Sequence, residues 1–319
     1  MGNVRSTWRR SRAGLNLAFG RFGLDYEPYA EERSYPMTRF VYIADTHLGA
    51  TENGYHQQSR YAERLPALLT ALDAWIQAQG DIAFVLHGGD MVDQATPTTL
   101  RAARELFRLS VPVYLCLGNH DLTTPDAATL WLREAPEFFS DQRLTYSLTL
   151  PDCVIHVVPT QWCAIPFFWE EEQMPHFLAE QRAYLTTALE CHPDRQHLLC
   201  THSEVLGVPP EQTGLAEPIH APLPAFTQMI VDLTRTYPQL GGVLSAHNHI
   251  NTHSVQGNAH LITVSALTET PFEFKVFTVT ATQFTMKTVN LLPAVEFKAA
   301  YNFDKTYVQG RCKERAFGG

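Results

Sequence analysis

The sequence predicts an α/β domain built from two β-sheets. In the first part of the chain, apolar runs of strand length alternate with amphipathic helical stretches, a pattern typical of βαβ units around a parallel sheet. Polar residues, chiefly Asp, His and Asn, directly follow three of these runs. The second half changes character, because shorter alternating runs separated by turns are typical of antiparallel strands.

Three predicted strands in the first half each end in a polar loop. They lie within RFVYIADTH (39–47), DIAFVLHGGD (81–90) and VPVYLCLGNHD (111–121). The stretches between them, 60–79 and 97–109, carry apolar residues at helical spacing. Because parallel strands direct their carboxyl ends to the same edge of a sheet, we expect the three polar loops to meet there.

The second half is expected to add a hairpin, two further strands with two helices, and a final antiparallel run. The hairpin is predicted at 144–159, the helices near 176–190 and 222–236, the strands at 197–202 and 241–249, and the antiparallel run at 260–267, 272–280 and 283–290. No internal repeat or linker-like tract divides the chain. We therefore expect one two-sheet domain over residues 39–292.

The two ends of the chain are expected to lie outside this domain. Residues 1–38 form a predicted N-terminal extension, whose first 24 residues carry five arginines and no acid. The Arg9–Arg10 pair is a feature of export signals, but Arg21 and several glycines interrupt any apolar core, so we do not expect export. Residues 293–319 are a predicted C-terminal arm with two open roles: covering its own core, or contacting a neighbouring subunit in a homo-oligomer.

The composition is typical of a soluble globular protein. The 319 residues are 45% hydrophobic and 18% charged, with a formal net charge of −9, which argues against disorder and against a broad electrostatic nucleic-acid binder. No apolar run approaches the roughly 20 residues of a membrane-spanning helix. The six cysteines include no CxxC pair, and a chain of this length does not need disulfides. We expect a reduced cytoplasmic protein without a membrane partner.

Five short polar blocks carry residues suited to a metal centre. They are Asp45 and His47 in DTHLG, Asp90 in GDMVD, Asn119, His120 and Asp121 in GNHD, His202 in THSE, and His247 and His249 in AHNHIN. Carboxylate, amide and imidazole groups in this mixture suit hard and borderline divalent metals. An HxH pair is a weak signal by itself, whereas GNHD is rarely produced by composition alone. The placement of every block directly after a predicted strand is the strongest indication.

In this order, the five blocks resemble the calcineurin-like metallophosphoesterase superfamily, and most of all its cyclic-nucleotide and glycerophosphodiester phosphodiesterase branch. The resemblance covers about residues 39–290. It implies a four-layer α/β/β/α sandwich of two mixed sheets flanked by helices, with two divalent or trivalent Mn, Fe or Zn ions. The implied ligands are Asp45, His47 and His249 for the first ion, Asn119, His202 and His247 for the second, and Asp90 as the bridge. Ala246 replaces a usual Gly, and the block around His202 lacks a His-Pro pair, but neither departure removes a ligand.

The implied reaction is hydrolysis of a phosphate ester by a metal-bridging hydroxide. Two divalent ions, two ligand carboxylates and one hydroxide leave a net charge near +1, which can hold a phosphate oxygen. His120 is expected to stabilise or protonate the leaving oxygen, and Asp121 to orient His120 or a neighbour. Asp93, on the same loop as Asp90, is expected to be structural.

The distribution of cations favours a small phosphodiester as the substrate. Every metal block lies in a stretch without Lys or Arg: between Arg39 and Arg60, Arg64 and Arg101, Arg108 and Arg133, Arg195 and Arg235, or Arg235 and Lys275. A phosphomonoester dianion usually needs an additional cationic clamp, whereas a diester monoanion does not. Arg143 or Arg311 would undo this argument if either reached the site.

Three alternative functions remain open at this point. A phosphomonoesterase would use the same metals. A DNA exonuclease of the SbcD type shares the DTHLG pattern but should carry a basic groove, which makes a nucleic-acid polymer a disfavoured partner. A catalytically silent scaffold should have lost some ligands or His120, and all of them are present.

Two residues are candidates for contact with substrate: His56, on the loop after the first strand, and Trp162. Trp162 opens an aromatic-rich loop, 161–173, that also carries Phe167, Phe168 and Trp169. These rings either form a pocket wall that stacks on a nucleobase or pack in the interior under the loop.

Overall fold

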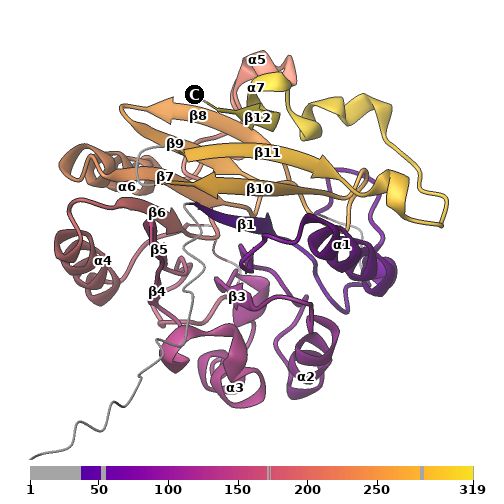
Figure 1. The fold of residues 1–319 in the computed structure, drawn as a ribbon, viewed down its shortest axis with the longest axis horizontal. Helices are drawn as coiled ribbons and strands as arrows, with labels where there is room; N and C mark the ends of the chain where they lie inside the picture. Colours follow the sequence, from indigo (N-terminus) through magenta and orange to yellow (C-terminus); the bar gives the residue numbers. More distant parts are fainter. Residues whose placement is uncertain (1–36, 52–54, 171, 173, 281–283, 319) are drawn as a thin grey trace, which may run out of the picture. The chain divides into compact units, whose positions relative to one another are not determined.

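The computed structural model describes residues 37–51, 55–170, 172, 174–280 and 284–318. Contacts divide the chain into two units, residues 1–34 and 35–319, and all described residues belong to the second unit. The predicted N-terminal extension therefore falls almost entirely outside the described residues. Figure 1 shows the arrangement of the helices and strands.

The first sheet has six strands in the order β12-β11-β10-β1-β2-β3. Their bounds are Thr38–Ile43 for β1, Val85–His87 for β2, Val113–Leu115 for β3, Glu273–Val279 for β10, Phe284–Asn290 for β11 and Ala316–Phe317 for β12. Strands β1, β2 and β3 are parallel, as predicted, so their carboxyl ends share one edge. Strand β10 runs antiparallel to both β1 and β11.

The second sheet also has six strands, in the order β4-β5-β6-β7-β9-β8. Their bounds are Tyr146–Thr149 for β4, Cys153–Val157 for β5, Gln196–Cys200 for β6, Leu240–Ser245 for β7, Thr252–Gln256 for β8 and Ala259–Thr263 for β9. The predicted hairpin is β4 and β5. Strands β5, β6, β7 and β9 are parallel, and β4 and β8 run antiparallel at the two edges.

The prediction of a single antiparallel run of strands over 260–290 was wrong in one respect. Strand β9 pairs in parallel with β7 in the second sheet, whereas β10 and β11 belong to the first sheet. Strand β8, which was not predicted, supplies the antiparallel partner of β9. Its sequence, THSVQ, is polar and only partly buried, so it lacks the apolar pattern of the other strands.

Helices flank both sheets, as expected for the four-layer arrangement (Figure 1). The longer helices are α1 (Leu65–Gln79), α2 (Pro97–Leu106), α3 (Ala127–Glu134), α4 (Ala179–Cys191) and α6 (Pro224–Thr236), and the short ones are α5 (Pro210–Thr213) and α7 (Cys312–Arg315). Short 3-10 turns occupy Ala62–Arg64, His120–Leu122, Pro136–Phe138, Ser140–Gln142, Leu292–Ala294 and Phe303–Gln309. None of the described helices has the length and apolar character needed to cross a bilayer.

Alternation along the central strands explains why the second sheet is covered on both faces. Leu198 and Leu244 belong to the large core that contains the first sheet, while their neighbours Leu199 and Val243 pack in a separate cluster with residues of α4 and α6. Because successive side chains of a strand point to opposite faces, apolar residues at consecutive positions bury both. These layers hold the strand ends, and hence the polar loops, in fixed positions.

The residues beyond 292 pack against the first sheet and the loop after β7. Strand β12 pairs with β11, and Arg315 forms a two-pronged ion pair with the buried Glu273. Glu273 also accepts a hydrogen bond from the Asn251 side chain at 2.7 Å, and the Asn251 amide donates to the carbonyl of Val308 at 2.8 Å. The C-terminal arm thus covers its own sheet and contacts the loop after β7.

Candidate metal centre

All seven predicted ligands lie in the loops at the carboxyl ends of five strands. Five of them have a backbone in the left-handed region, with φ of 53° at Asp45, 43° at His47, 54° at Asp90, 68° at His247 and 58° at His249. Such conformations cost of the order of 1–3 kcal/mol each when unsupported, and they cluster at functional sites. The loops are therefore held in geometries that direct these side chains toward one another.

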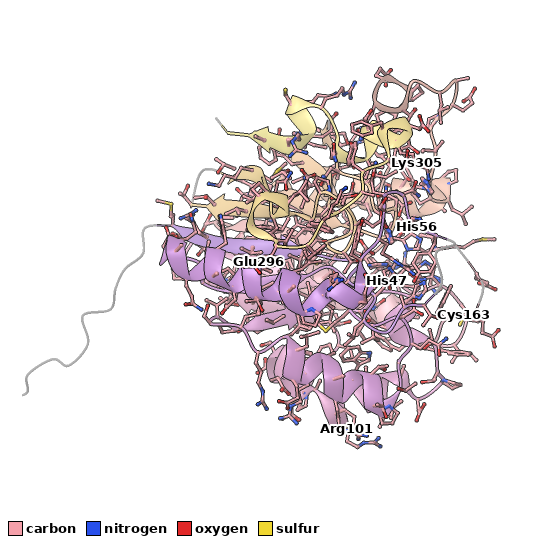
Figure 2. All side chains as sticks on the ribbon, turned by 90° about the vertical axis from the view of Figure 1, so that its right-hand side faces the viewer. His47, His56, Arg101, Cys163, Glu296 and Lys305 are labelled. Carbon is pink, nitrogen blue, oxygen red and sulfur yellow. The ribbon has the colours of Figure 1, made fainter. Side chains whose placement is uncertain are left out.

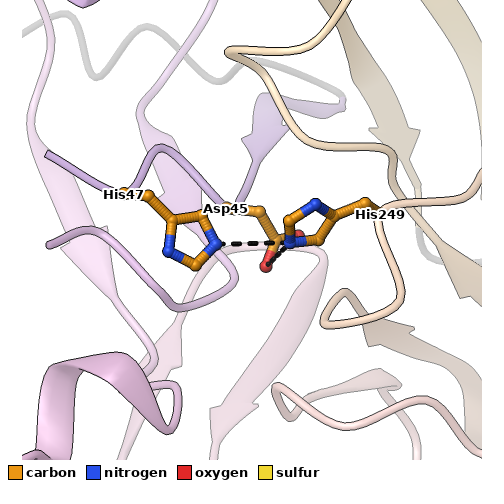
Figure 3. Close-up of side chains that lie close together, drawn as sticks. All are labelled: Asp45, His47 and His249. Carbon is orange, nitrogen blue, oxygen red and sulfur yellow. Dashed lines mark hydrogen bonds and ion pairs between the residues drawn. The ribbon is translucent and has the colours of Figure 1, made fainter. Parts of the chain in front are cut away.

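Asp45, His47 and His249 form the first cluster (Figure 3). The Nε2 atoms of the two histidines lie 3.2 Å apart, and Asp45 Oδ1 lies 3.6 Å from His249 Nε2. Asp45 is fully buried, yet neither of its carboxylate oxygens has a hydrogen-bond partner. A buried carboxylate without partners is costly. A cation between the three side chains would remove this cost.

Asn119, His202 and His247 form the second cluster. His247 Nδ1 lies 3.1 Å from Asn119 Oδ1 and 3.3 Å from His202 Nε2. Asp90 stands between the two clusters, because its Oδ2 is 3.2 Å from His202 Nε2 and 3.8 Å from His47 Nε2. This is the position that a ligand shared by two ions requires.

Hydrogen bonds on the far side of the rings orient two of the histidines. His202 Nδ1 lies 2.8 Å from the carbonyl of Gly88, and His249 Nδ1 lies 2.5 Å from the carboxylate of Glu269. Glu269 is buried and also accepts the backbone N–H groups of Gln57 and Gln58, at 2.9 and 2.6 Å. A carboxylate behind a ligand histidine fixes its tautomer and raises its basicity. The sequence analysis missed Glu269, since it stands in no metal block and gives no local signal.

Burial and charge set the protonation of the clusters. Burial lowers the pKa of His47 to about 4 and that of His247 to about 3, which keeps both rings neutral and able to coordinate. Burial raises the pKa of Asp45 to about 6. Burial acts against protonation of His202, but the neighbouring Asp90 outweighs it and raises the pKa of His202 to about 10.

His120 lies beside the clusters and is held by two aspartates. Its backbone N–H donates to Asp90 Oδ1 at 2.8 Å, and its Nδ1 lies 3.1 Å from the carbonyl of Asp93 and 3.5 Å from the Asp93 carboxylate. Burial would lower the pKa of His120, but Asp90 and Asp93 raise it to about 9. Asp93 was expected to be structural, whereas it contacts His120, His47 and the hydroxyl of Tyr55.

Asp121 lies next to His120 in the sequence but does not touch its ring in the described contacts. The Asp121 carboxylate is fully buried and accepts the N–H groups of Val92, at 3.1 Å, and Gly118, at 2.9 Å. It therefore ties the GDMVD loop to the GNHD loop. The side chain that orients His120 is Asp93.

A pocket of about 600 Å³ opens over the clusters. Besides several predicted ligands, it is lined by His120, Tyr55, Gln57, Trp169, Glu204 and His220, and no Lys or Arg from the described residues lines it. The two substrate candidates, His56 and Trp162, are not among the lining residues. Trp162 is 1% exposed, with its ring centre 5.7 Å from His202 and 6.0 Å from His247, so it supports the second cluster from inside.

A model of the calcineurin-like phosphoesterase family matches residues 38–251, well over half of the chain. The chain belongs to the calcineurin-like phosphoesterase family. Its members are metal-dependent phosphoric ester hydrolases that use two divalent ions, and the two clusters described above are candidate ligand sets for such ions. The resemblance drawn from the five sequence blocks is thus confirmed at the level of the superfamily.

Curated relatives match a short part of the chain. A DNA double-strand break repair protein Mre11 of Methanococcus maripaludis is 34% identical over 90 residues, which are 26% of this chain and 23% of that protein. The Mre11 protein of Archaeoglobus fulgidus is 31% identical over 103 residues, 30% of this chain and 22% of its own length. The chain thus spans less than a quarter of either relative.

Solved structures share the fold over a longer range. A dimetal phosphatase from Danio rerio has a TM-score of 0.59 at 18% identity, covering 80% of this chain and 96% of that one. The Plasmodium protein GAP50, described as the anchor in the inner membrane complex, has a TM-score of 0.55 at 10% identity, covering 87% and 90%. At such identities the likeness shows the fold alone.

Proposed function

We propose that this chain hydrolyses a small phosphodiester, of the cyclic-nucleotide or glycerophosphodiester type, with two metal ions. The observation that carries the proposal is the pocket above the clusters, which no Lys or Arg from the described residues lines. A phosphomonoester brings two negative charges and usually meets a cationic clamp, whereas a diester brings one.

The donor set fits two ions of Mn, Fe or Zn. Asp45, His47 and His249 would hold the first ion, Asn119, His202 and His247 the second, and Asp90 would bridge them. The partnerless carboxylate oxygens of Asp45 support this assignment. Such ions, when bound, lower the pKa of coordinated water and so supply a nucleophile at neutral pH.

The charges around the pocket support a monoanionic substrate. Glu204 lines the pocket as a buried carboxyl group, and burial raises its pKa to about 7. Two nearby cations contact lining residues but do not themselves line the pocket: Arg60 lies 5.1 Å from the ring centre of Tyr55, and Lys305 donates to Gln57 at 3.3 Å. Figure 2 shows Lys305 and His56 on the same side of the unit as His47. Arg311 does not line the pocket and instead binds Glu314 and the carbonyl of Glu211.

His120 is the proton donor of the proposed reaction. It lines the pocket next to the clusters, and the carbonyl and carboxylate of Asp93 beside its Nδ1 favour the protonated ring. Asp93 holds the Nδ1 side of the ring, which leaves Nε2 free to give a proton to the leaving oxygen. Asp121 fixes the loop that carries His120.

A nuclease is the second candidate, since the two curated relatives are named as DNA double-strand break repair proteins. The net charge of −9 and the cation-free pocket speak against tracking of a DNA backbone. A silent scaffold, suggested by the anchor description of GAP50, is disfavoured because all seven ligands and His120 are present.

Hydrolysis of bis(p-nitrophenyl) phosphate against p-nitrophenyl phosphate tests the proposal. The protein is stripped of metal and reloaded with Mn²⁺, and Asp45→Asn serves as the inactive control. We expect a clear preference for the diester. A preference for the monoester would refute the charge argument, and an inactive protein with two bound ions would refute hydrolysis and favour the scaffold.

A further inference from the structure

Trp169 is a pocket-lining aromatic side chain that the proposed reaction does not use. It is only partly buried, and its ring centre lies 5.1 Å from that of His120 with the planes tilted by 36°. The Tyr55 ring also lies near His120, with the ring centres 5.0 Å apart and the planes tilted by 46°. The proposed proton donor thus has two aromatic neighbours.

Trp169 is fixed on both its backbone and its side chain. Its backbone N–H donates to the carbonyl of Leu122, the residue after the GNHD block, at 2.8 Å. Its indole N–H donates to the carbonyl of Glu172 at 3.0 Å. The loop is pinned further at Gln161, whose side chain accepts the N–H of Phe167 at 2.7 Å. Because the only polar group of the indole is already paired, a ligand in the pocket meets its apolar surface.

A rigid and partly exposed indole beside a proton donor suits one kind of ligand. Aromatic rings gain most from stacked or edge contacts with other rings. A side chain that is already ordered loses little conformational entropy when a ligand covers it. Packing under the loop, the alternative for this aromatic segment, accounts fully for Trp162, which is buried. Trp169 also packs against the core, but it stays partly exposed and lines the pocket.

We propose that Trp169 determines specificity by stacking on a planar aromatic group carried by the leaving oxygen of the substrate. The inference rests on the proposed function in one respect, because the position of His120 defines the leaving-group side. It goes further in naming the substrate class: phosphodiesters whose leaving group bears an aryl or nucleobase ring, in preference to alkyl or glycerol diesters.

Binding of two matched ligands to the Mn²⁺-loaded protein tests this. The monomethyl esters of benzylphosphonate and cyclohexylmethylphosphonate each carry one negative charge and have a CH₂ group in the place of the leaving oxygen, and they differ in having a planar or a puckered ring. Calorimetry should show tighter binding of the benzylphosphonate ester by about tenfold, since stacking on an aromatic side chain is worth about 1–3 kcal/mol.

Three variants test whether the indole of Trp169 causes the preference for the aromatic ester. Trp169→Ala should abolish the preference and Trp169→Phe should keep part of it. Ile165→Ala, on the same loop and 53% exposed, should leave it unchanged. Circular dichroism and Mn content check that each variant is folded and loaded.

The outcomes separate this inference from the proposed function. Equal binding of the two esters by the unmodified protein, or a preference that survives in Trp169→Ala, overturns the stacking role. Should the preference hold while bis(p-nitrophenyl) phosphate is not cleaved, the proposed function falls and the aromatic subsite stands. If bis(p-nitrophenyl) phosphate is cleaved but the two esters bind equally, the proposed function stands and the aromatic subsite falls.

Discussion

Acid should destabilise this protein through a pair of buried histidines that are not among the proposed metal ligands. His156 on β5 and His197 on β6 lie side by side, with His156 Nε2 2.8 Å from His197 Nδ1. The outer nitrogens contact the hydroxyl of Ser147, at 2.7 Å, and the carbonyl of His192, at 2.8 Å. Because a carbonyl only accepts, His197 Nε2 carries the proton. Burial lowers the pKa of both rings and so favours their neutral forms, in which His197 Nδ1 accepts from His156 Nε2 and His156 Nδ1 accepts from Ser147.

The size of the effect follows from the pKa of His156. Burial lowers it from 6.5 to about 3. Between these values the unfolded chain binds more protons than the folded one, so the contribution to stability is complete above pH 6.5 and is lost as the pH falls toward 3. One pH unit corresponds to about 1.4 kcal/mol, so acidification to pH 4.5 should cost about 2.7 kcal/mol through this residue.

Urea unfolding at pH 7.5 and at pH 4.5 measures this cost. His156→Gln is the informative variant, because a Gln side chain has a donor and an acceptor for the same two partners but does not titrate. Between the two pH values, the unmodified protein should lose about 2.7 kcal/mol more free energy of unfolding than the variant. The proposed metal ligands are unchanged in both proteins, so their titration should cancel in the comparison.

His176→Gln is the matched control, since the described hydrogen bonds of His176 are backbone bonds to Gln161, outside this network. It should follow the unmodified protein. Equal losses in the unmodified protein and in His156→Gln would refute the assignment of neutral, buried rings.

Three further predictions concern the centre. Asn119→Ala should lose one ion by elemental analysis, whereas His120→Ala should keep both and lose about 10²–10⁴-fold in turnover, the usual contribution of a general acid. Glu269→Gln should weaken Mn²⁺ affinity by about 10–100-fold in a chelator competition, since it removes the charge behind His249. Gly89→Ala should disturb the second cluster and lower the melting temperature, because φ is +111° and a Cβ there would lie 2.4 Å from His202 Nδ1 and 2.8 Å from the amide of Gly118.

The sequence predicted the parts of the molecule that are encoded locally. Asp45, Asp90 and Asn119 each follow an apolar run, so the strand period and the parallel topology were enough to bring them together. Strand β9 was misplaced because a short alternating run does not specify which of two sheets it will join.

The residues that surround the proposed ligands could not be predicted from local sequence patterns. Glu269 reaches His249 from a loop between the two sheets, and Asp93 reaches His120 from a neighbouring strand end. Trp162 was the predicted candidate for substrate contact, whereas Trp169 of the same aromatic segment lines the pocket, because only the path of the segment decides which ring faces it. Whether the seven ligands bind two ions stays a prediction until metal content is measured.

The position of the C-terminal arm has a consequence for the order of events during biosynthesis. The loop that carries His247 and His249 ends at Asn251, which is held by Val308 and, through Glu273, by Arg315. A ribosome makes these supporting residues after the loop itself. The loop can therefore reach its final geometry only once residues 308–315 have also emerged from the ribosome, and binding of metal ions by the completed loop should follow that point.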